Sequence, residues 1–450
     1  APFREKGFGL YQVSRLLLIT AGQIVFVALG WHVYSITGSL FHLGMIGFAQ
    51  FLPNLLLSLF GGHAADRLDR RRIVMACALA SAATAGLLAW GTGLDSSRQL
   101  VLIYVACALM GTLRAFSAPA GHAFLPALVP ASLLRHAVVL HLTIFQIATV
   151  IGPMLGGYVY REHQPSRVYG VATALYIVAF VGLSFLEAHP KLPSHPEPFR
   201  RAVGAGLRHV WKDKRLLGAM SLDLFAVLLG GATALLPAIV KDILHAGPEV
   251  LGFLRSSQAA GAGLVALLLA FRPLGGRIGA WLFAGVAVFG LATVGLGLSR
   301  SLPLTAGFLA IAGAADMLSV TVRHTLIQVA TPDAMRGRVS AVSMVFINAS
   351  NELGEFESGV TAHWWGTPIA VVVGGAGTLA VVQLWMALFP SLRKADKFED
   401  GPELSPARRP DDAGIAEGHD TADEELHRIG GGVGVEQMPG ERGGRAGRVH

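Results

Sequence analysis

Long apolar stretches that carry almost no charge dominate this sequence. Only 14% of the residues are charged, against about 25% in an average globular chain, so the chain cannot cover a water-exposed surface. A bilayer core of about 30 Å needs about 20 mostly apolar residues per helix. Twelve runs meet that length: residues 10–35, 44–63, 73–93, 100–119, 136–159, 168–187, 216–240, 249–271, 278–298, 303–324, 338–363 and 367–389. The sequence therefore predicts an all-α, polytopic membrane protein with twelve transmembrane helices.

Lysine and arginine residues in the loops predict the orientation of these helices. With the N-terminus in the cytoplasm, eighteen loop Lys and Arg residues fall on the cytoplasmic side and five on the other. The positive-inside rule favours that arrangement. We therefore expect a multi-pass protein with both termini in the cytoplasm. No basic run is interleaved with exposed aromatic residues, which argues against a nucleic-acid partner.

The two halves of the chain repeat each other. Three patterns recur at an offset of 202 residues: Arg114-Ala-Phe-Ser with Asp316-Met-Leu-Ser, Pro130 with Pro332, and Gly152-x-x-x-x-Gly157 with Gly354-x-x-x-x-Gly359. Each half holds six spans, an even number, so the repeats are parallel and leave a cavity between two bundles at mid-membrane. This organisation excludes neither a transporter nor a duplicated structural protein.

The repeat divides the chain into four parts. We expect six-helix bundles at residues 1–187 and 216–390, and a cytoplasmic linker at 188–215. The linker contains a basic amphipathic segment, Phe199 to Trp211, which is typical of a helix on a membrane surface; a plain solvated linker is the alternative. Residues 391–450 hold 13 of the 29 acidic residues, and we expect a disordered cytoplasmic tail there.

The loop after the second span carries a basic cluster behind an acid. It reads Gly62-His-Ala-Ala-Asp66-Arg67-Leu-Asp69-Arg70-Arg71-Arg72. Positive-inside anchoring alone could explain it, but the spacing also resembles the G-x-L-a-D-R-x-G-R-R signature of the major facilitator superfamily. Ala64 replaces the usual Leu, and Asp69 replaces the second Gly, whose left-handed conformation an Asp can adopt. The resemblance implies a conformational latch in which the Asp66 anion meets a helix N-terminus, formed by Gly62, Asp66, Arg67 and Arg70.

The fifth span carries small residues at regular spacing around a proline. It reads Ala148-x-x-x-Gly152-Pro153-Met-Leu-Gly156-Gly157. Small residues let helices approach closely, and Pro153 removes a backbone donor, so ordinary helix packing is one interpretation. The run is also similar to the g-x-x-x-G-P-x-x-G-G motif of facilitator-superfamily exporters, which importers usually lack. The resemblance therefore implies export.

Segments of the second half resemble one branch of that superfamily more closely, the enterobactin-exporter-type and related drug-efflux branch. The resemblance covers about residues 5–395 and rests on five segments: Leu235-Leu-Pro237, Leu254-Arg255-Ser-Ser, Asp316 to Arg323, Thr331 to Ser340 and Asn351 to Gly359. The last two are the most specific.

Ionisable residues within membrane spans are functional candidates. Nine lie away from the span ends: Arg15, Arg114, Asp223, Arg255, Asp316, Arg323, Glu352, Glu355 and Glu357. Each costs about 2.5–3.5 kcal/mol to insert unpaired, so they must pair or face a wet cavity. We expect proton coupling or cavity contact from Asp223, Glu355, Glu352, Asp316, Arg323, Arg114 and Arg255. A static ion pair is the alternative role for each acid.

Two geometric expectations narrow this set. Asp316 and Arg323 lie seven residues apart, two turns along one helical face. Asp223 and the Glu352/Glu355 pair are the acids expected to lack a permanent basic partner, which makes Asp223 the first candidate proton carrier and Glu355 the second.

Other polar residues within spans could contact a substrate. The candidates are Gln23, Asp223, Gln258, Asn348 and Asn351, although a glutamine in a span also commonly forms helix–helix hydrogen bonds. The histidines show no metal-ligand spacing. No phosphate-binding loop occurs, and no catalytic constellation is present. We expect no metal, no cofactor and no enzymatic activity.

These observations and the resemblance together predict a secondary active exporter of a bacterial inner membrane. It would exchange protons for a siderophore-like or amphipathic drug-like small molecule and would act as a monomer in the lipid bilayer. A proton-coupled uptake symporter is one alternative, and a non-transporting membrane scaffold or sensor is another.

Overall fold

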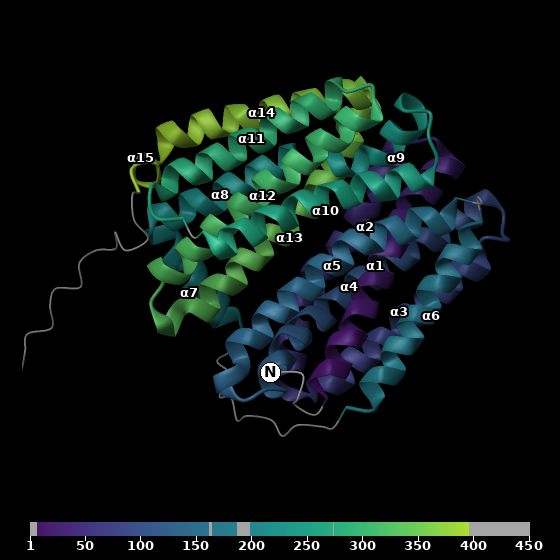
Figure 1. Cartoon of the computed structure of the whole chain (residues 1–450), viewed down its shortest axis with the longest axis horizontal. Coiled ribbons are helices and arrows are strands. Elements are labelled where there is room, and N and C mark those ends of the chain that lie inside the picture. The colour runs from purple at the N-terminus through teal and green to yellow at the C-terminus, as the bar shows by residue number, and fades with distance from the viewer. Residues whose placement is uncertain (1–6, 162–163, 187–198, 273, 396–450) are drawn as a thin grey trace, which may run out of the picture. The chain divides into compact units, whose positions relative to one another are not determined.

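Helices fill nearly all of the computed structural model, which describes residues 7–161, 164–186, 199–272 and 274–395 and contains no strand in those ranges (Figure 1). The first half holds α1 (Phe8–Thr37), α2 (Leu40–Arg67), α3 (Arg70–Gly91), α4 (Ser96–Phe124), the 3₁₀ turns η2 (Leu125–Ala127) and η3 (Ala131–Leu133), α5 (Leu134–Tyr160) and α6 (Pro165–Ser184). The second half holds α7 (Phe199–Lys212), α8 (Lys214–Leu229), η4 (Ala232–Leu235), α9 (Leu236–Ala238), η5 (Ile239–Ile243), α10 (Pro248–Phe271), α11 (Ile278–Leu298), α12 (Leu302–Ala330), α13 (Asp333–Trp365), α14 (Thr367–Leu388) and α15 (Pro390–Arg393).

The helices begin where the sequence supplies a cap or a preset backbone angle. The carboxylates of Asp69, Asp95 and Asp213 accept hydrogen bonds from backbone N–H groups in the first turns of α3, α4 and α8, which satisfies donors that the helix leaves unpaired. Helices α6, α10, α12 and α14 each carry a proline in their first turn, where a missing N–H costs nothing.

The prediction of twelve membrane helices in two sets of six is confirmed. Eleven spans among the described residues are long and apolar enough to cross a membrane, with residues 214–243 counted as one. The twelfth is α13, which has 33 residues but contains Glu352, Glu355 and Glu357. These acids lower its hydropathy, so α13 belongs to the set by its length and packing rather than by its composition.

The two halves repeat the same helix pairings. In the first half α2 packs on α4, α3 on α4 and α6, and α1 on α5 and α6; in the second half α10 packs on α12, α11 on α12 and α14, and α8 on α13 and α14. Between the halves, α5 packs on α10 and α2 packs on α13. Since α13 is the repeat of α5 and α10 is the repeat of α2, these two contacts are equivalent. The packing thus follows the duplication read from the sequence.

The seventh span is broken, which the sequence analysis missed. It was expected as one run over residues 216–240, but α8 ends at Leu229 and is followed by 3₁₀ and π-helical turns. The break at Gly230 and Gly231 lets the backbone approach α13 closely: a Cβ on Gly231 would lie 3.1 Å from the Glu355 nitrogen. A residue with a side chain could not occupy that position without displacing α13.

The linker and the tail also depart from expectation in part. Helix α7 occupies the expected amphipathic segment, while residues 187–198 lie outside the described residues. The tail was expected to begin at residue 391, but Leu392 is fully buried against the second half, and the Gly279 N–H donates to the Ala395 carbonyl at 3.1 Å. Residues 391–395 are therefore part of the fold, and 396–450 lie outside the described residues.

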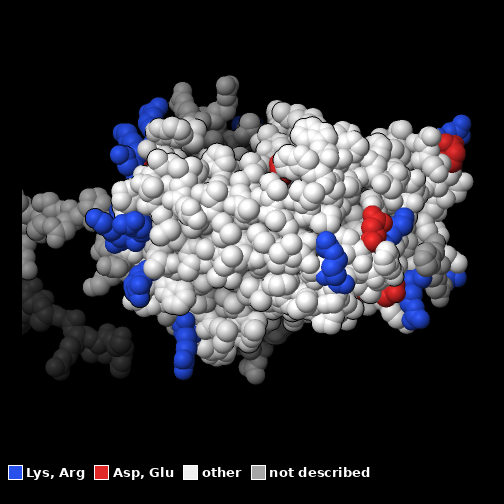
Figure 2. All heavy atoms as spheres, turned by 90° about the horizontal axis from the view of Figure 1, so that it is seen from above, with Lys and Arg blue, Asp and Glu red and all other residues white. Residues whose placement is uncertain are grey.

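Most of the charge on the visible face lies towards the two ends of the helices. Figure 2 shows Lys and Arg gathered at one end, a broad belt with few charged residues, and mixed acidic and basic residues towards the other end. Large apolar side chains within this fold are exposed, such as Leu264, Leu268 and Phe271 of α10 at 55–78%. An exposed apolar belt of this kind suits contact with lipid tails rather than water.

Candidate functional site

Backbone contacts between glycines join the two halves at one end, which we call the contact end. A Cβ on Gly157 of α5 would lie 3.0 Å from the Gly252 Cα of α10, and a Cβ on Gly44 of α2 would lie 2.8 Å from the Gly359 Cα of α13. Gly157 and Gly359 are the last residues of the pattern that recurs at an offset of 202. The repeat therefore supplies one glycine to each of the two equivalent contacts.

The small-residue run of α5 also fixes its distance from α1. A Cβ on Gly152 would lie 2.6 Å from the Gln23 Cβ, and one on Gly156 would lie 3.1 Å from the Ile24 Cα. Pro153 lies within α5 between them and is buried. Gly152 and Gly156 thus face α1 while Gly157 faces α10, so the run packs α5 against both halves.

Polar contacts also cross between the halves. Arg114 Nη1 of α4 donates to Glu352 Oε1 of α13 at 2.7 Å. Gln146 Nε2 of α5 donates to the carbonyl of Ala259 in α10 at 2.6 Å. At the contact end, the Tyr34 hydroxyl donates to the Asp242 carboxylate. These contacts are non-covalent, so they can break and re-form when the two halves move relative to each other.

The geometry corrects the expected pairing of the intramembrane acids. Asp223 of α8 forms an ion pair with Arg323 of α12, and both side chains are nearly fully buried. Arg323 and Asp316 are two turns apart on α12, about 10 Å along the helix axis. Because of this separation, Arg323 pairs with Asp223 of α8 and not with Asp316. The expectation that Asp223 and Glu352 lack basic partners was therefore wrong.

Asp316, like Glu355 and Glu357, forms no ion pair with a described residue. It has no hydrogen bond or ion pair within the part of the chain that the structure describes. It lies inside α12, seven residues from the buried pair of Arg323. A half-buried carboxyl group with no basic partner is a better proton site than one already committed to an ion pair.

Arg255 and Glu355 lie where the halves meet. The Arg255 guanidinium of α10 lies 4.3 Å from the Phe26 ring of α1, and Arg255 Nη2 donates to the Thr233 carbonyl at 3.3 Å. A Cβ on Gly47 of α2 would lie 2.8 Å from the Glu355 Cβ. Both residues therefore sit against helices of the first half.

A cavity of about 530 Å³ lies within the first half. Its lining comes from α1 to α6 and includes Arg15, Gln23, Phe26, Gln50, Ser81, Met110, Arg114, Ser117, His141, Phe145 and Tyr176. Of the residues predicted to contact substrate, Gln23 lines this cavity. Asp223 is buried in α8, Gln258 is half-buried in α10, and Asn348 and Asn351 lie on α13, all outside the lining.

Several cavity residues were not assigned a role from the sequence. Arg15 was identified only as an intramembrane charge, and Phe26, Phe145 and Tyr176 were given no role. Gln50 of α2 lines the cavity, and Asn54, one turn further along α2, lies outside the lining. Each is 5% exposed, and their spacing could have identified this polar pair. The rotation of each helix about its own axis decides which aromatic rings line a cavity, and the pattern of apolar residues does not define that rotation.

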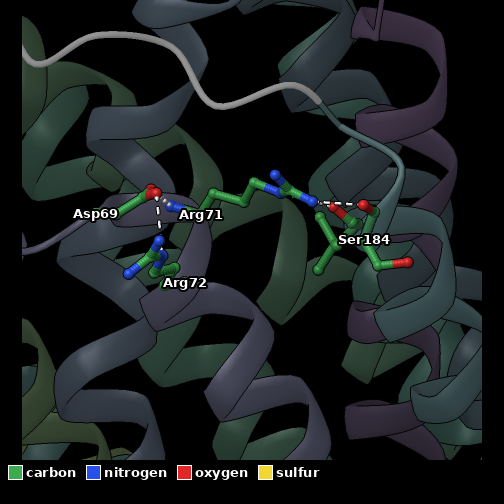
Figure 3. A network of polar contacts seen from close by, with 5 residues as sticks. Asp69, Arg71, Arg72 and Ser184 are labelled. Atoms are coloured by element: carbon green, nitrogen blue, oxygen red, sulfur yellow. Dashed lines mark hydrogen bonds and ion pairs between the residues drawn. The ribbon is translucent and has the colours of Figure 1, made fainter.

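The basic loop between α2 and α3 makes a different set of contacts from the one expected. Asp69 is in an extended conformation, φ −64° and ψ 114°, and caps α3 by accepting from the Arg71 N–H at 2.9 Å; the left-handed conformation was the wrong expectation. Arg72 forms an ion pair with Asp69, and the Arg71 guanidinium donates to the carbonyls of Leu183 and Ser184 at the end of α6 (Figure 3). A cation there satisfies carbonyls that the helix leaves unpaired.

The expected latch residues surround this loop. Gly62 is half-buried within α2, Arg67 lies in its last turn, and Arg70 Nε donates to the Ala65 carbonyl at 3.4 Å. The side chain of Asp66 lies outside the described residues. No group of three metal-binding side chains occurs in the described part of the chain.

Comparison with known proteins agrees with this architecture. A family model described as "Transmembrane secretion effector" matches residues 1–408. The multidrug efflux pump Tap of Mycobacterium tuberculosis is 30% identical over 75% of this chain and 83% of its own length. The enterobactin exporter EntS of Citrobacter koseri is 26% identical over 88% of this chain and 94% of its own, and the staphyloferrin A transporter of Staphylococcus aureus is 23% identical over 83% and 94%.

Solved structures share the fold. A bacterial homologue of the human lysosomal transporter Spinster, inward-facing and unoccupied, is similar with a TM-score of 0.66 and 14% identity over 86% of this chain and 95% of its own. The nucleoside transporter NupG is similar with a TM-score of 0.68 and 12% identity over 85% of this chain and 100% of its own. With its duplicated six-helix halves and a family match over residues 1–408, the chain belongs to the transmembrane secretion effector family of the major facilitator superfamily, whose members are transporters and not enzymes.

Proposed function

We propose that this chain is a secondary active exporter that works by alternating access and exchanges protons for siderophore-like or amphipathic drug-like molecules. The observation that carries the proposal is the pair of equivalent glycine contacts between the halves, Gly157 with Gly252 and Gly44 with Gly359. Two halves that touch through backbone at one end can rock about that contact and open a path to each side of the membrane in turn.

Two findings support export rather than uptake. The relatives Tap and EntS are described as an efflux pump and an exporter. The run from Gly152 to Gly157, similar to the exporter motif of the superfamily, packs α5 against both α1 and α10. The excess of loop Lys and Arg residues on one side supports a bacterial inner-membrane protein with both termini in the cytoplasm, and we propose one chain as the transporting unit.

We propose Asp316 as the proton carrier, in place of Asp223. The carboxylate of Asp223 is committed to Arg323, and that of Glu352 to Arg114. Glu355 stays the second candidate, because it has no described ion pair and lies against α2. Exchange requires that proton and substrate each favour a different facing state through their differential affinity.

The latch also stays a proposal. Asp66, with Gly62, Arg67 and Arg70, would hold one facing state at the basic loop. The contacts of Arg71 with the end of α6 support a stiff connection there, because they link α3 to α6 independently of Asp66.

Transport by the purified chain in proteoliposomes tests the proposal. Liposomes with an acidic lumen and with an acidic exterior are compared, with ethidium and 2,3-dihydroxybenzoylserine as probes. Antiport predicts accumulation of at least one probe with the acidic lumen and its loss when nigericin collapses the gradient. Accumulation only with the acidic exterior would indicate a symporter, and no accumulation of either probe in any gradient would contradict the transport proposal for these substrate classes.

A further inference from the structure

The charged residues that line the first-half cavity all have the same sign. Arg15 of α1 and Arg114 of α4 contribute to the lining, and no Asp or Glu is among the described lining residues. Phe26, Phe145 and Tyr176 add aromatic surface. A concave site with two fixed cations and several aromatic rings offers both a charged part and an apolar part for binding an amphipathic molecule.

The two arginines lie at a similar depth in the helical bundle. Arg15 is seven residues from the start of α1 at Phe8, and Arg114 is ten residues from the end of α4 at Phe124. At 1.5 Å per residue these positions lie about 10 Å and about 15 Å from the same end of the helices. The guanidinium groups therefore lie well inside the helical layer, where a charge interacts more strongly than in water.

Each guanidinium retains donors for a ligand. Arg15 Nη1 donates to the His141 carbonyl at 2.6 Å, and its guanidinium carbon lies 5.9 Å from the centre of the Phe145 ring. Arg114 uses Nη1 for Glu352, and its side chain is 49% exposed. Since a guanidinium has five N–H donors, these contacts hold both groups in place and leave others to face the cavity.

The surroundings of the cavity balance only part of this charge. Glu352, whose side chain is 7% exposed, pairs with Arg114, and Glu355 lies near enough to Arg114 and to Arg255, the cation over Phe26, to interact with both. Arg15 forms no ion pair with a described residue, so its charge is the one in the lining that no acid balances. Positive charges in a low-dielectric cleft attract anions and repel cations.

From these observations we infer that the cavity binds amphipathic organic anions: a carboxylate, sulfonate or catecholate group on an aromatic body. The anionic group is held by the donors of Arg15 and Arg114, as guanidinium groups bind carboxylates, and the body packs against Phe145 and Phe26. A volume of about 530 Å³ fits a molecule of drug size. This inference rests on the proposed function, since it names the substrate class of the exporter.

A matched pair of fluorescent probes tests the charge preference. Dansylglycine and dansylethylenediamine share one fluorophore and differ in the sign of their charge. We expect the protein in lipid nanodiscs to bind dansylglycine with a Kd at least tenfold lower than that of dansylethylenediamine. Equal binding of the two probes, or tighter binding of the cation, would overturn the inference.

Variants assign the preference to the two arginines. Arg15→Gln and Arg114→Gln should each raise the Kd of dansylglycine at least tenfold and leave that of the cation within twofold. Arg98→Gln, at an exposed ion pair outside the cavity, is the matched control and should change neither. Because Arg114→Gln leaves Glu352 without its partner, the double variant Arg114→Gln/Glu352→Gln is measured as well and should lose dansylglycine binding equally. Wild-type dansylglycine affinity in both Arg15→Gln and the double variant would reject the site.

The inference and the proposed function can fail separately. If a pH gradient drives ethidium but dansylglycine does not bind, the exporter stands and the anion site is wrong. If dansylglycine binds through Arg15 and Arg114 but no gradient moves any probe, the site stands and proton-driven export is wrong.

Discussion

The two halves pair their helices in the same way but differ in their buried charges. Among the nine intramembrane charges, the first half contributes only the cations Arg15 and Arg114, whereas the second half contributes all five acids together with Arg255 and Arg323. The glycine contacts, by contrast, are matched: Gly157 in one half and Gly359 in the other. Duplication has therefore kept the packing and let the chemistry diverge, so that a basic cavity lies in one half and the acids lie in the other.

Helices α5 and α13 show the same difference on a smaller scale. Both supply a glycine to a contact between the halves. Helix α5 is apolar enough to cross a membrane by composition, whereas α13 carries three glutamates within its length. Two of the glutamates of α13 are tolerated because they face protein: Glu352 is paired with Arg114, and Glu355 lies against Gly47 of α2. A charged helix can thus occupy the place of an apolar one when its neighbours come from the other half.

The largest expected effect lies in the second half, at the buried pair Asp223–Arg323. Arg323→Leu leaves a buried carboxylate without its partner and should cost about 3–5 kcal/mol of stability. Thermal unfolding in detergent measures the loss. Arg98→Leu, at the exposed pair with Asp95, should cost about 0–1 kcal/mol. The double variant Asp223→Leu/Arg323→Leu should regain most of the stability, and an Arg323→Leu protein as stable as Arg98→Leu would show that the pair is not structural.

The second prediction tests whether the two glycine contacts between the halves are functionally equivalent. Gly157→Leu and Gly359→Leu should each reduce transport about 10- to 100-fold, because overpacking of this kind costs about 1–3 kcal/mol and the halves could no longer close. Gly170→Leu and Gly307→Leu, where an added Cβ meets nothing within 4 Å, are the controls. If only one of the two contact variants loses transport, the repeat is not functionally symmetric.

A third prediction separates Asp316 from Glu357, another acid of the second half that forms no described ion pair. Asp316→Asn should reduce pH-gradient-driven accumulation about tenfold and leave downhill substrate exchange within about twofold, since a carrier that cannot titrate loses coupling but not access. Glu357→Gln should retain both activities. Undiminished gradient-driven accumulation by Asp316→Asn would move the role to Glu355.

The smallest effect concerns the basic loop of the first half. Asp69→Ala removes the carboxylate that caps α3 and should cost about 1 kcal/mol, read as a modest fall in Tm. Asp95→Ala, which removes the equivalent cap of α4, should cost a similar amount. A much larger loss in transport than in stability for Asp69→Ala alone would give Asp69 a role in the latch.

Features that depend on one stretch of chain could be predicted from the sequence, and those that depend on neighbouring helices could not. The helix positions and the close approach at Gly156 follow from apolar runs and small-residue spacing. The pair Asp223–Arg323 depends on α8 lying beside α12 with both residues at one level. The break at Gly230–Gly231 depends on the approach of α13. Asp69 was predicted as a turn residue because its family position is a glycine, whereas its side chain makes it an N-cap.

The most direct test of alternating access follows both ends of α5 and α10 at once. Spin labels at Arg161 and Glu249 report on the contact end, and labels at Arg135 and Arg272 report on the opposite end, in a background without Cys77 and Cys107. Double electron–electron resonance in nanodiscs between pH 5 and pH 8 should show one distance lengthening as the other shortens, and Asp316→Asn should make both distances independent of pH. Distances that stay fixed, or that lengthen together, would contradict an exporter in which the two halves rock against each other.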